Sequence, residues 1–285
     1  MLRVFTPVVG GLLFLSALPA LGVLAQPVLP GSVHAGPPPP TFLGIEGDTL
    51  RDEDFGRFGG WFVGDLAGIV TEAEPRDAAV VLAVGGGAAL LSLADEPLSE
   101  GAQRYYRGPI ADVLGIANEL GNVRGLAAVG LLWAGSLLTS NTRLQDAAYT
   151  SFESALISGA LTAGVKEVVG RARPDTTSDP YTFDPFSGNT SFPSGHTANV
   201  FAVVTPWAVY YPSAWTKGLF VLAASTAVSR VAKERHWPSD VLAGAAVGTL
   251  TGYLLARRHI RLSAEEGAEE DLLLAPPVIS VSFRF

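Results

Sequence analysis

The sequence predicts an all-α fold, a helical bundle of about six core helices followed by a short strand-like tail. Three observations lead to this prediction. Hydrophobic residues make up 48% of the 285 residues, and from Ala78 onward they gather in long apolar stretches separated by short polar breaks. Several stretches are apolar all round and rich in Ala and Gly, which is typical of closely packed helices. The chain contains no cysteine, so no disulfide or thiolate-bound metal contributes to its stability.

The N-terminal segment has the pattern of a secretory signal peptide. A single cation, Arg3, precedes an apolar run over residues 8–24, which ends in small-residue spacing before a cleavage position at Ala25. We therefore predict a signal peptide over residues 1–25. An uncleaved anchor helix is the alternative, because one cation makes a thin positive flank. Residues 26–48 are predicted to form a Pro-rich linker.

One helical domain is predicted over residues 49–262. Its first segment, residues 55–70, has aromatic side chains at roughly helical spacing and is expected to form a helix lying on the bundle. The six core helices are expected at 78–94, 125–138, 147–165, 197–211, 218–228 and 241–256. Most of these stretches have 11 to 19 residues. They are at or below the ~20 residues needed to cross a bilayer, so a soluble bundle and a membrane-spanning bundle both remain open.

Residues 263–285 are predicted to be an acidic linker and a strand-like tail. The acidic run covers residues 265–271, and hydrophobic residues recur at every second position near the end of the chain. A single strand cannot close a membrane barrel. The hypothesis is therefore that the tail is a packing edge strand or a tag for membrane handling.

Three separated blocks carry the residues that suggest chemistry. They are Lys166…Arg173-Pro174, Pro193-Ser194-Gly195-His196 and Ser229-Arg230…His236…Asp240. Together they supply three cations, backbone donors, two imidazoles and one carboxylate. Phosphoryl transfer asks a protein mainly for positioning and charge stabilisation, so this set is sufficient for the reaction without a metal ion.

The spacing within the blocks suggests a role for each side chain. His236 has Asp240 one helical turn later, so the carboxylate is expected to keep one ring nitrogen protonated while the other attacks phosphorus. His196 is then the candidate general acid. Lys166 and Arg173 are seven residues apart, and both are expected on one face of a helix that ends near Arg173.

Two predicted helix starts are expected to face the same ligand. The sequence at 193–195 opens one apolar helix, and Pro238 occupies a first-turn position of another. A helix N-terminus presents free N–H groups and a positive dipole end to an anion, and Gly195 lets the backbone approach phosphate closely.

In this order and spacing, the three blocks resemble those of the type-2 phosphatidic acid phosphatase and haloperoxidase superfamily, without a departure in any block. The resemblance covers 166–240 and implies that His236 is the nucleophile, His196 the acid and Asp240 the residue that orients His236. It also implies phosphate-binding roles for a further set: Lys166, Arg173, Ser194, Gly195 and Arg230. No metal and no cofactor is implied.

Other charged residues near the blocks are expected to have no direct role. Arg171 and Arg235 lie beside motif positions and are expected to be solvated or to stand behind the residues that contact the ligand. His34 and His259 receive no role. The acidic residues between the first two blocks lack the spacing of a calcium loop and are expected to be solvated: Asp175, Asp179 and Asp184.

The expected function is a metal-independent phosphatase acting on phosphomonoesters or pyrophosphates through a phosphohistidine. Its apolar helices favour lipid phosphates such as phosphatidic acid, or isoprenyl or diacylglycerol pyrophosphates. A vanadate-dependent haloperoxidase and a non-specific periplasmic acid phosphatase are the alternatives. A binding module with a dead site is disfavoured, because no catalytic position is substituted.

The net charge and the predicted export signal limit the classes of partner and the location that we expect. A formal net charge of −8 argues against nucleic acid, so the expected partner is a small-molecule or lipid phosphate, with membrane contact. The protein is expected to be exported, either periplasmic or membrane-associated with its active site on the periplasmic side. The sequence makes no prediction of oligomeric state.

Overall fold

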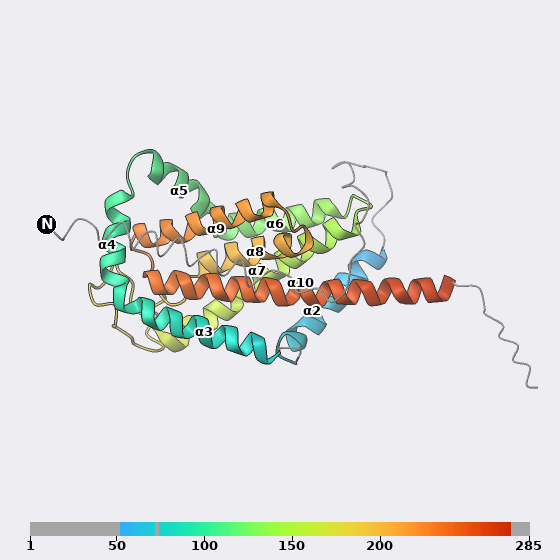
Figure 1. The fold of residues 1–285 in the computed structure, drawn as a ribbon, viewed down its shortest axis with the longest axis horizontal. Coiled ribbons are helices and arrows are strands. Elements are labelled where there is room, and N and C mark those ends of the chain that lie inside the picture. The colour runs from blue at the N-terminus through green and yellow to red at the C-terminus, as the bar shows by residue number, and fades with distance from the viewer. Residues whose placement is uncertain (1–51, 72–73, 275–285) are drawn as a thin grey trace, which may run out of the picture.

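The computed structural model describes residues 52–71 and 74–274, and this part of the chain is helical (Figure 1). Its helices, in chain order, are α2 (Asp52–Thr71), α3 (Pro75–Leu91), η1 (Ser92–Ala94), α4 (Asp95–Tyr105), α5 (Pro109–Glu119), α6 (Val123–Ser136), α7 (Thr142–Val169), α8 (Gly195–Tyr210), α9 (Ala214–Ala232) and α10 (Pro238–Leu274). The all-α prediction is confirmed. The predicted signal peptide, the Pro-rich linker and the strand-like tail lie outside the described residues.

All six predicted core helices are present, as α3, α6, α7, α8, α9 and α10, and the aromatic segment at 55–70 forms α2. Two short helices, α4 and α5, were not predicted. The predicted acidic linker is wrong in its first half, because α10 continues through Leu274 and includes the acidic run 265–271. Ala, Glu and Leu dominate this stretch, and these residues have high helix propensity.

The centre of the bundle is the contact between α8 and α10, with α7 packed against both (Figure 1). Glycines on α10 allow this close approach. A Cβ at Gly248 would lie 2.1 Å from the carbonyl oxygen of Ala198, and one at Gly244 would lie 2.4 Å from that of Ser194. Phe201 and Ala245 are among the buried side chains that fill the core nearby. The first turns of α8 and α10 are therefore held side by side.

The end of α7 determines where the first block turns towards this place. Gly170 closes the helix in the left-handed region, with φ of 57°, and a Cβ there would lie 1.9 Å from the carbonyl oxygen of Asp184. Only glycine fits such a position. Lys166 thus lies in the last turn of α7, whereas Arg173 lies beyond the helix in an irregular segment. The prediction that both lie on one helix is wrong.

A second buried polar cluster joins α2, α7 and α10. His259 Nε2 lies 2.6 Å from Asp65 Oδ2 and 3.6 Å from Glu153 Oε2, and Arg258 Nε donates to Asp65 Oδ1 at 2.6 Å. His259 Nδ1 lies 2.7 Å from the hydroxyl of Thr150. Asp65 of α2 therefore bonds both Arg258 and His259 of α10, and these contacts fasten α2 to the bundle. No role is predicted for His259 from the sequence, so this contact is a finding of the structure.

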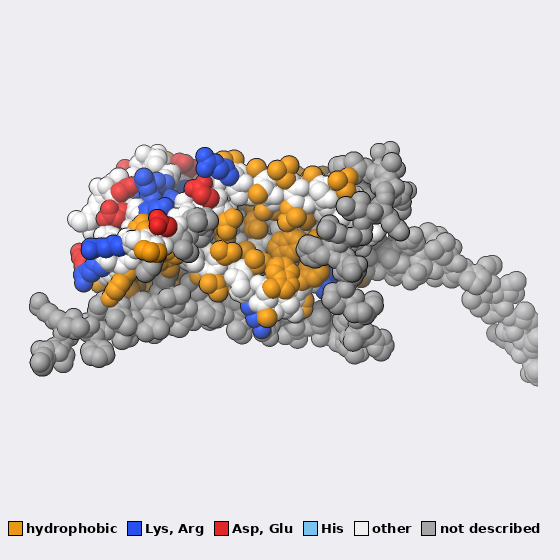
Figure 2. Space-filling model, turned by 90° about the horizontal axis from the view of Figure 1, so that it is seen from above, with side chains coloured by type: hydrophobic (Ala, Val, Ile, Leu, Met, Phe, Trp, Pro, Cys, Tyr) orange, Lys and Arg blue, Asp and Glu red, His pale blue; other side chains and the backbone are white. Residues whose placement is uncertain are grey.

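The surface has a hydrophobic region and a charged end. Figure 2 shows charged side chains gathered at one end of the viewed face and hydrophobic side chains over its middle. Two helical segments, Pro75–Tyr105 and Pro238–Glu265, are long and apolar enough to cross a membrane. In the most apolar 18-residue stretch of the first segment, only 11% of the residues are buried within the structure. Exposed leucines on α3 and α6, such as Leu82 and Leu131, extend this apolar surface and support a location at a membrane.

Candidate functional site

The three blocks converge at the end of the bundle where α7 ends and α8 and α10 begin. His196 stands in the first turn of α8, Arg230 in the last turn of α9 and His236 just before α10. Electrostatic coupling shows their proximity. Nearby Arg230, His236 and Lys166 each contribute to lowering the pKa of His196, after burial, which is the largest cause. The structure thus brings together side chains that are 70 residues apart in the sequence.

The three cations, Lys166, Arg173 and Arg230, are half-buried, and the described part of the protein satisfies only some of their hydrogen-bond donors. Lys166 Nζ donates to the carbonyl oxygens of Thr190, at 2.5 Å, and Pro193, at 2.7 Å. Arg173 Nη2 donates to Thr190 Oγ1 at 3.0 Å, and Arg230 Nη1 donates to Asn118 Oδ1 at 3.1 Å. Within the described part of the chain, the Nε atoms of both arginines are buried without a hydrogen-bond partner.

Such unpaired buried donors are costly, and an anion with several acceptor oxygens would satisfy them. Burial and the repulsion between cations also lower the pKa values of Lys166 and Arg230, which a bound anion would counteract. Burial, followed by the charges of Arg173 and Arg230, lowers the pKa of Lys166 to about 8. Burial and Arg173 also lower the pKa of Arg230 to about 10. A bound dianion would reverse both effects, so the cation group is suited to phosphate.

His236 is 2% exposed, and its proton position is fixed by its hydrogen bond. Its Nδ1 lies 2.7 Å from the carbonyl oxygen of Ser191, which can only accept, so Nδ1 carries the proton and Nε2 presents a lone pair. Burial lowers the pKa of His236 to about 4, although the nearby carboxylate of Asp240 opposes this shift. The ring is therefore neutral and nucleophilic near pH 7.

Asp240 differs in its contacts from the sequence prediction. Its Oδ2 is 3.8 Å from His236 Nδ1, too far for a hydrogen bond, and instead accepts from Ser191 Oγ at 2.5 Å and from the N–H of Trp237 at 2.9 Å. The carboxylate is thus linked to His236 through Ser191, whose hydroxyl donates to Asp240 and whose carbonyl oxygen accepts from the His236 ring. The sequence could not indicate Ser191, because it belongs to none of the three blocks.

The second block is used partly for structure. Ser194 is fully buried, its hydroxyl lies 2.9 Å from that of Thr197, and its N–H donates to the carbonyl oxygen of Asp240 at 3.0 Å. These contacts connect the start of α8 to the first turn of α10. The N–H groups of the first turn of α8, which begins at Gly195, have no carbonyl partner within the helix. They are the backbone donors available to an anion.

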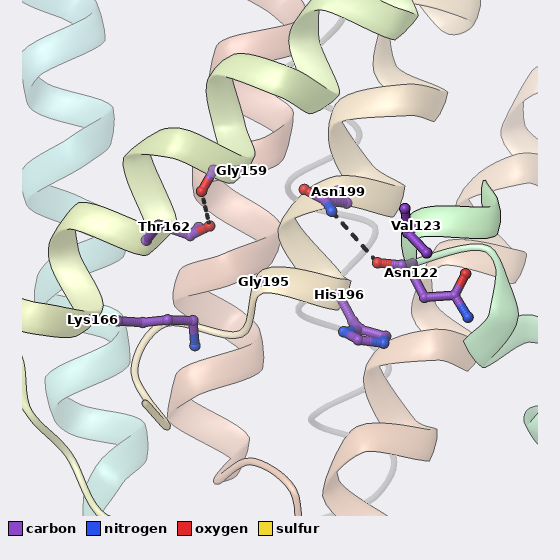
Figure 3. Close-up of a pocket in the computed structure, with 10 residues that line it drawn as sticks. Asn122, Val123, Gly159, Thr162, Lys166, Gly195, His196 and Asn199 are labelled. Carbon is purple, nitrogen blue, oxygen red and sulfur yellow. Dashed lines mark hydrogen bonds between the residues drawn. The ribbon is translucent and has the colours of Figure 1, made fainter. Parts of the chain in front are cut away.

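A cavity of about 320 Å³ opens beside the cations (Figure 3). It is lined by the turn between α5 and α6, by α7 and by the start of α8: Gly121, Asn122, Val123, Gly159, Thr162, Ala163, Lys166, Gly195, His196 and Asn199. His196 stands at its wall and Lys166 reaches it from the opposite side, whereas His236 is not part of the lining. A leaving group that occupied this cavity would be next to His196.

The remaining charged residues divide into two groups. Arg235 is half exposed and pairs with Asp175 at 2.9 Å, as expected of solvated residues. Arg171 is instead 2% exposed and bonded to Asp240, so of the two expectations for it the structure agrees with a position behind the residues expected to contact the ligand, and not with a solvated side chain. Asn118, on the unpredicted helix α5, is a further contact of Arg230 that the sequence did not reveal.

Comparisons with known proteins agree with this geometry. A family model of the PAP2 superfamily matches residues 148–263. A lipid A 1-phosphatase from Porphyromonas gingivalis is 42% identical over 103 residues, which is 35% of this chain and 21% of that protein. A lipid A 1-phosphatase from Rhizobium etli is 37% identical over 115 residues, 39% of this chain and 49% of that protein. The chain thus spans between about a fifth and a half of the curated relatives that it matches.

A solved structure shares the fold. It is the crystal structure of a transmembrane PAP2-type phosphatidylglycerolphosphate phosphatase from Bacillus subtilis, with a TM-score of 0.50 and 24% sequence identity. The alignment covers 70% of this chain and 98% of that one. The three blocks and their convergence agree with the match of residues 148–263 to the PAP2 superfamily model.

Proposed function

We propose that this protein is a metal-independent phosphatase that hydrolyses a lipid phosphate through a phosphohistidine intermediate on His236. The observation that supports it most is the pairing of a buried neutral imidazole, whose Nδ1 proton is held by Ser191, with three cations whose bonding capacity is incompletely used. The matched relatives are lipid A 1-phosphatases. Together with the apolar surface, this favours a lipid substrate.

In the first step, His236 Nε2 attacks phosphorus and the bond to the leaving oxygen breaks. Lys166, Arg173 and Arg230 stabilise the charge on the three equatorial oxygens, with help from the first-turn N–H groups of α8. The imidazole ring becomes positive as the N–P bond forms. The nearby carboxylate of Asp240 then stabilises a charge that is absent from the ground state.

His196 supplies the proton for the leaving oxygen. Burial, Arg230 and His236 lower its pKa to about 4 in the empty site, so it is neutral there near pH 7. A bound phosphate dianion raises this pKa because it favours the imidazolium. His196 then protonates the leaving alcohol, and the neutral ring that results removes a proton from the water that hydrolyses the phosphohistidine.

The sidedness of the site forms part of the proposal. The predicted N-terminal export signal favours a site on the periplasmic side. Arg257 and Arg258 follow the apolar part of α10, about 30 Å along the helix from its first turn, and suit the cytoplasmic side. A lipid phosphate would then reach the cavity from the outer half of the bilayer.

The proposal is tested by phosphate release from purified full-length protein in detergent with excess chelator. The substrates are p-nitrophenyl phosphate, phosphatidic acid and a lipid A 1-phosphate, and wild type is compared with His236→Ala. We expect the wild type to turn over at least one lipid phosphate and the variant to lose activity by about 10⁴-fold or more. Loss of activity on adding chelator would contradict the metal-independent mechanism, and an active His236→Ala would contradict the nucleophile.

A further inference from the structure

Arg171 is a buried cation that cannot bind the substrate. Its guanidinium donates to Asp240 Oδ1 at 2.6 Å and to Ser239 Oγ at 2.7 Å from Nη1, and to Asp95 Oδ2 at 2.7 Å from Nη2. Nε and Nη2 also donate to the carbonyl oxygen of Pro180, at 3.0 and 2.7 Å. Every nitrogen of the guanidinium thus has a partner, whereas the Nε atoms of Arg173 and Arg230 have none among the described residues.

Asp95 completes the surroundings of Arg171 from a distant part of the chain. It is the first residue of α4 and is fully buried. Its Oδ1 accepts the N–H of Ser239 at 2.8 Å, and its Oδ2 accepts the hydroxyl of Ser239 at 2.6 Å as well as Arg171. The carboxylate therefore bonds to the first turn of α10 and to Arg171 together. It lies outside residues 148–263, the segment that matches the family.

A continuous path of hydrogen bonds leads from Asp95 to His236. Arg171 Nη1 donates to Oδ1 of Asp240, and the hydroxyl of Ser191 donates to Oδ2 of Asp240 at 2.5 Å. The carbonyl oxygen of Ser191 accepts the Nδ1 proton of His236. The main chain closes the path, because the N–H of Ser191 donates to the carbonyl oxygen of Arg171 at 3.0 Å.

The charges along this path explain why two carboxylates are needed. Arg171 alone would neutralise Asp240, and its second partner Asp95 leaves the buried group with one net negative charge. His236 is neutral before the reaction and gains positive charge as the N–P bond forms. A net negative group next to it favours that change, and a neutral group would not.

We propose that Asp95 and Arg171 are positioning residues for phosphoryl transfer, acting on His236 through Asp240 and Ser191. This inference rests on the proposed phosphatase function of the same site. It assigns to the unpredicted helix α4 a part in the reaction, since α4 supplies the carboxylate that divides the charge of Arg171 between two partners.

The central variant is Asp95→Asn, which keeps the shape of the side chain and removes its charge. Glu96→Gln is the matched control, because Glu96 is the next residue and is exposed. Both are assayed as full-length protein in detergent on the substrate that wild type turns over best. We expect Asp95→Asn to lower kcat about 10- to 100-fold with KM changed less than about twofold, and Glu96→Gln to match wild type.

Inhibition by vanadate separates positioning from folding. Vanadate bound to a histidine resembles the five-coordinate transition state, so its Ki follows transition-state stabilisation. We expect the Ki of vanadate to rise in Asp95→Asn by the factor by which kcat/KM falls, while the Ki of phosphate stays within about twofold. A merely structural role would reduce the amount of active enzyme and leave both Ki values at their wild-type levels.

Arg171→Lys provides a second, independent variant, with Arg104→Lys as its exposed control. Lysine keeps the charge but cannot bond two carboxylates in the fixed fork of a guanidinium. We expect the same parallel change in kcat/KM and vanadate Ki. Wild-type kinetics in Asp95→Asn, or lower kcat with an unchanged vanadate Ki in both variants, would overturn the inference. An inactive wild type would instead overturn the proposed function.

Discussion

Arg171 and Arg173 are two positions apart and have different environments. Arg171 gives all its nitrogens to protein acceptors, whereas Arg173 keeps a buried Nε without a partner in the described chain. This difference supports the proposal that Arg171 positions other residues and that Arg173 binds the anion. The sequence identified Arg173 from its block, but it could not identify Arg171, because Asp95 lies 76 positions away and only folding brings the two together.

The low pKa of His236 predicts a dependence of stability on pH. The unfolded ring has a pKa near 6.5, and the folded one has a pKa of about 4, so the unfolded state binds a proton more readily at intermediate pH. Stability from this group is fully present above pH 6.5 and is lost as the pH falls through about 4. A shift of this size corresponds to about 3 kcal/mol.

The measurement is the free energy of unfolding in phosphate-free buffer between pH 7.5 and pH 4. Wild type is compared with His236→Asn, which removes the titrating group and keeps a donor for the carbonyl of Ser191. We expect the variant to lose less stability over this range than wild type does. Equal losses in the two proteins would show that His236 does not titrate as its burial requires.

At the scale of elements, the contact between α8 and α10 positions the site, because it holds the first turns of both helices together. This contact depends on glycine. A Cβ at Gly248 would lie 2.1 Å from the carbonyl oxygen of Ala198 and 2.8 Å from the N–H nitrogen of Ala202, and backbone atoms cannot move aside as a flexible side chain can.

We therefore predict that Gly248→Ala destabilises the protein by about 2 kcal/mol or more, because the two helices must separate. Gly218→Ala is the control, since a Cβ at Gly218 on α9 would meet no atom within 4 Å. Ala has the higher helix propensity, so this control should gain about 0.5–1 kcal/mol. Thermal unfolding of both variants in detergent is the test, and equal stability of the two would contradict the close approach.

Most helices could be predicted from the sequence. The helices that the prediction missed, and the helix end that it misplaced, have physical explanations. The long apolar stretches predicted α3 and the helices from α6 through α10, because burial against neighbouring helices leaves a clear hydrophobic pattern. Helices α4 and α5 have 11 residues each, and α4 is mostly polar, so no comparable pattern marks them. The error at the end of α7 arose because Gly170, rather than Pro174, ends the helix.

At the scale of the whole molecule, the candidate site lies at one end of the bundle, and a buried ionic cluster lies further along α10. The cations proposed to bind phosphate gather where α7 ends and α8 and α10 begin. The cluster of Asp65, Arg258 and His259 fastens α2 about 30 Å further along α10. Apolar side chains are exposed between them, on α3 and α6 among others. This arrangement suits a bundle in contact with a bilayer, with its site near one face.

The proposed reaction requires that a phosphoryl group is transferred to His236. Its most direct test mixes wild type with a phosphate-labelled lipid substrate and stops the reaction with alkali within the first turnover, since phosphohistidine is stable in alkali and labile in acid. Mass spectrometry of the peptides then locates the phosphoryl group. We expect it on His236 and expect none in His236→Ala. Turnover by wild type with no phosphorylated His236, or with the label on another residue, would contradict the account.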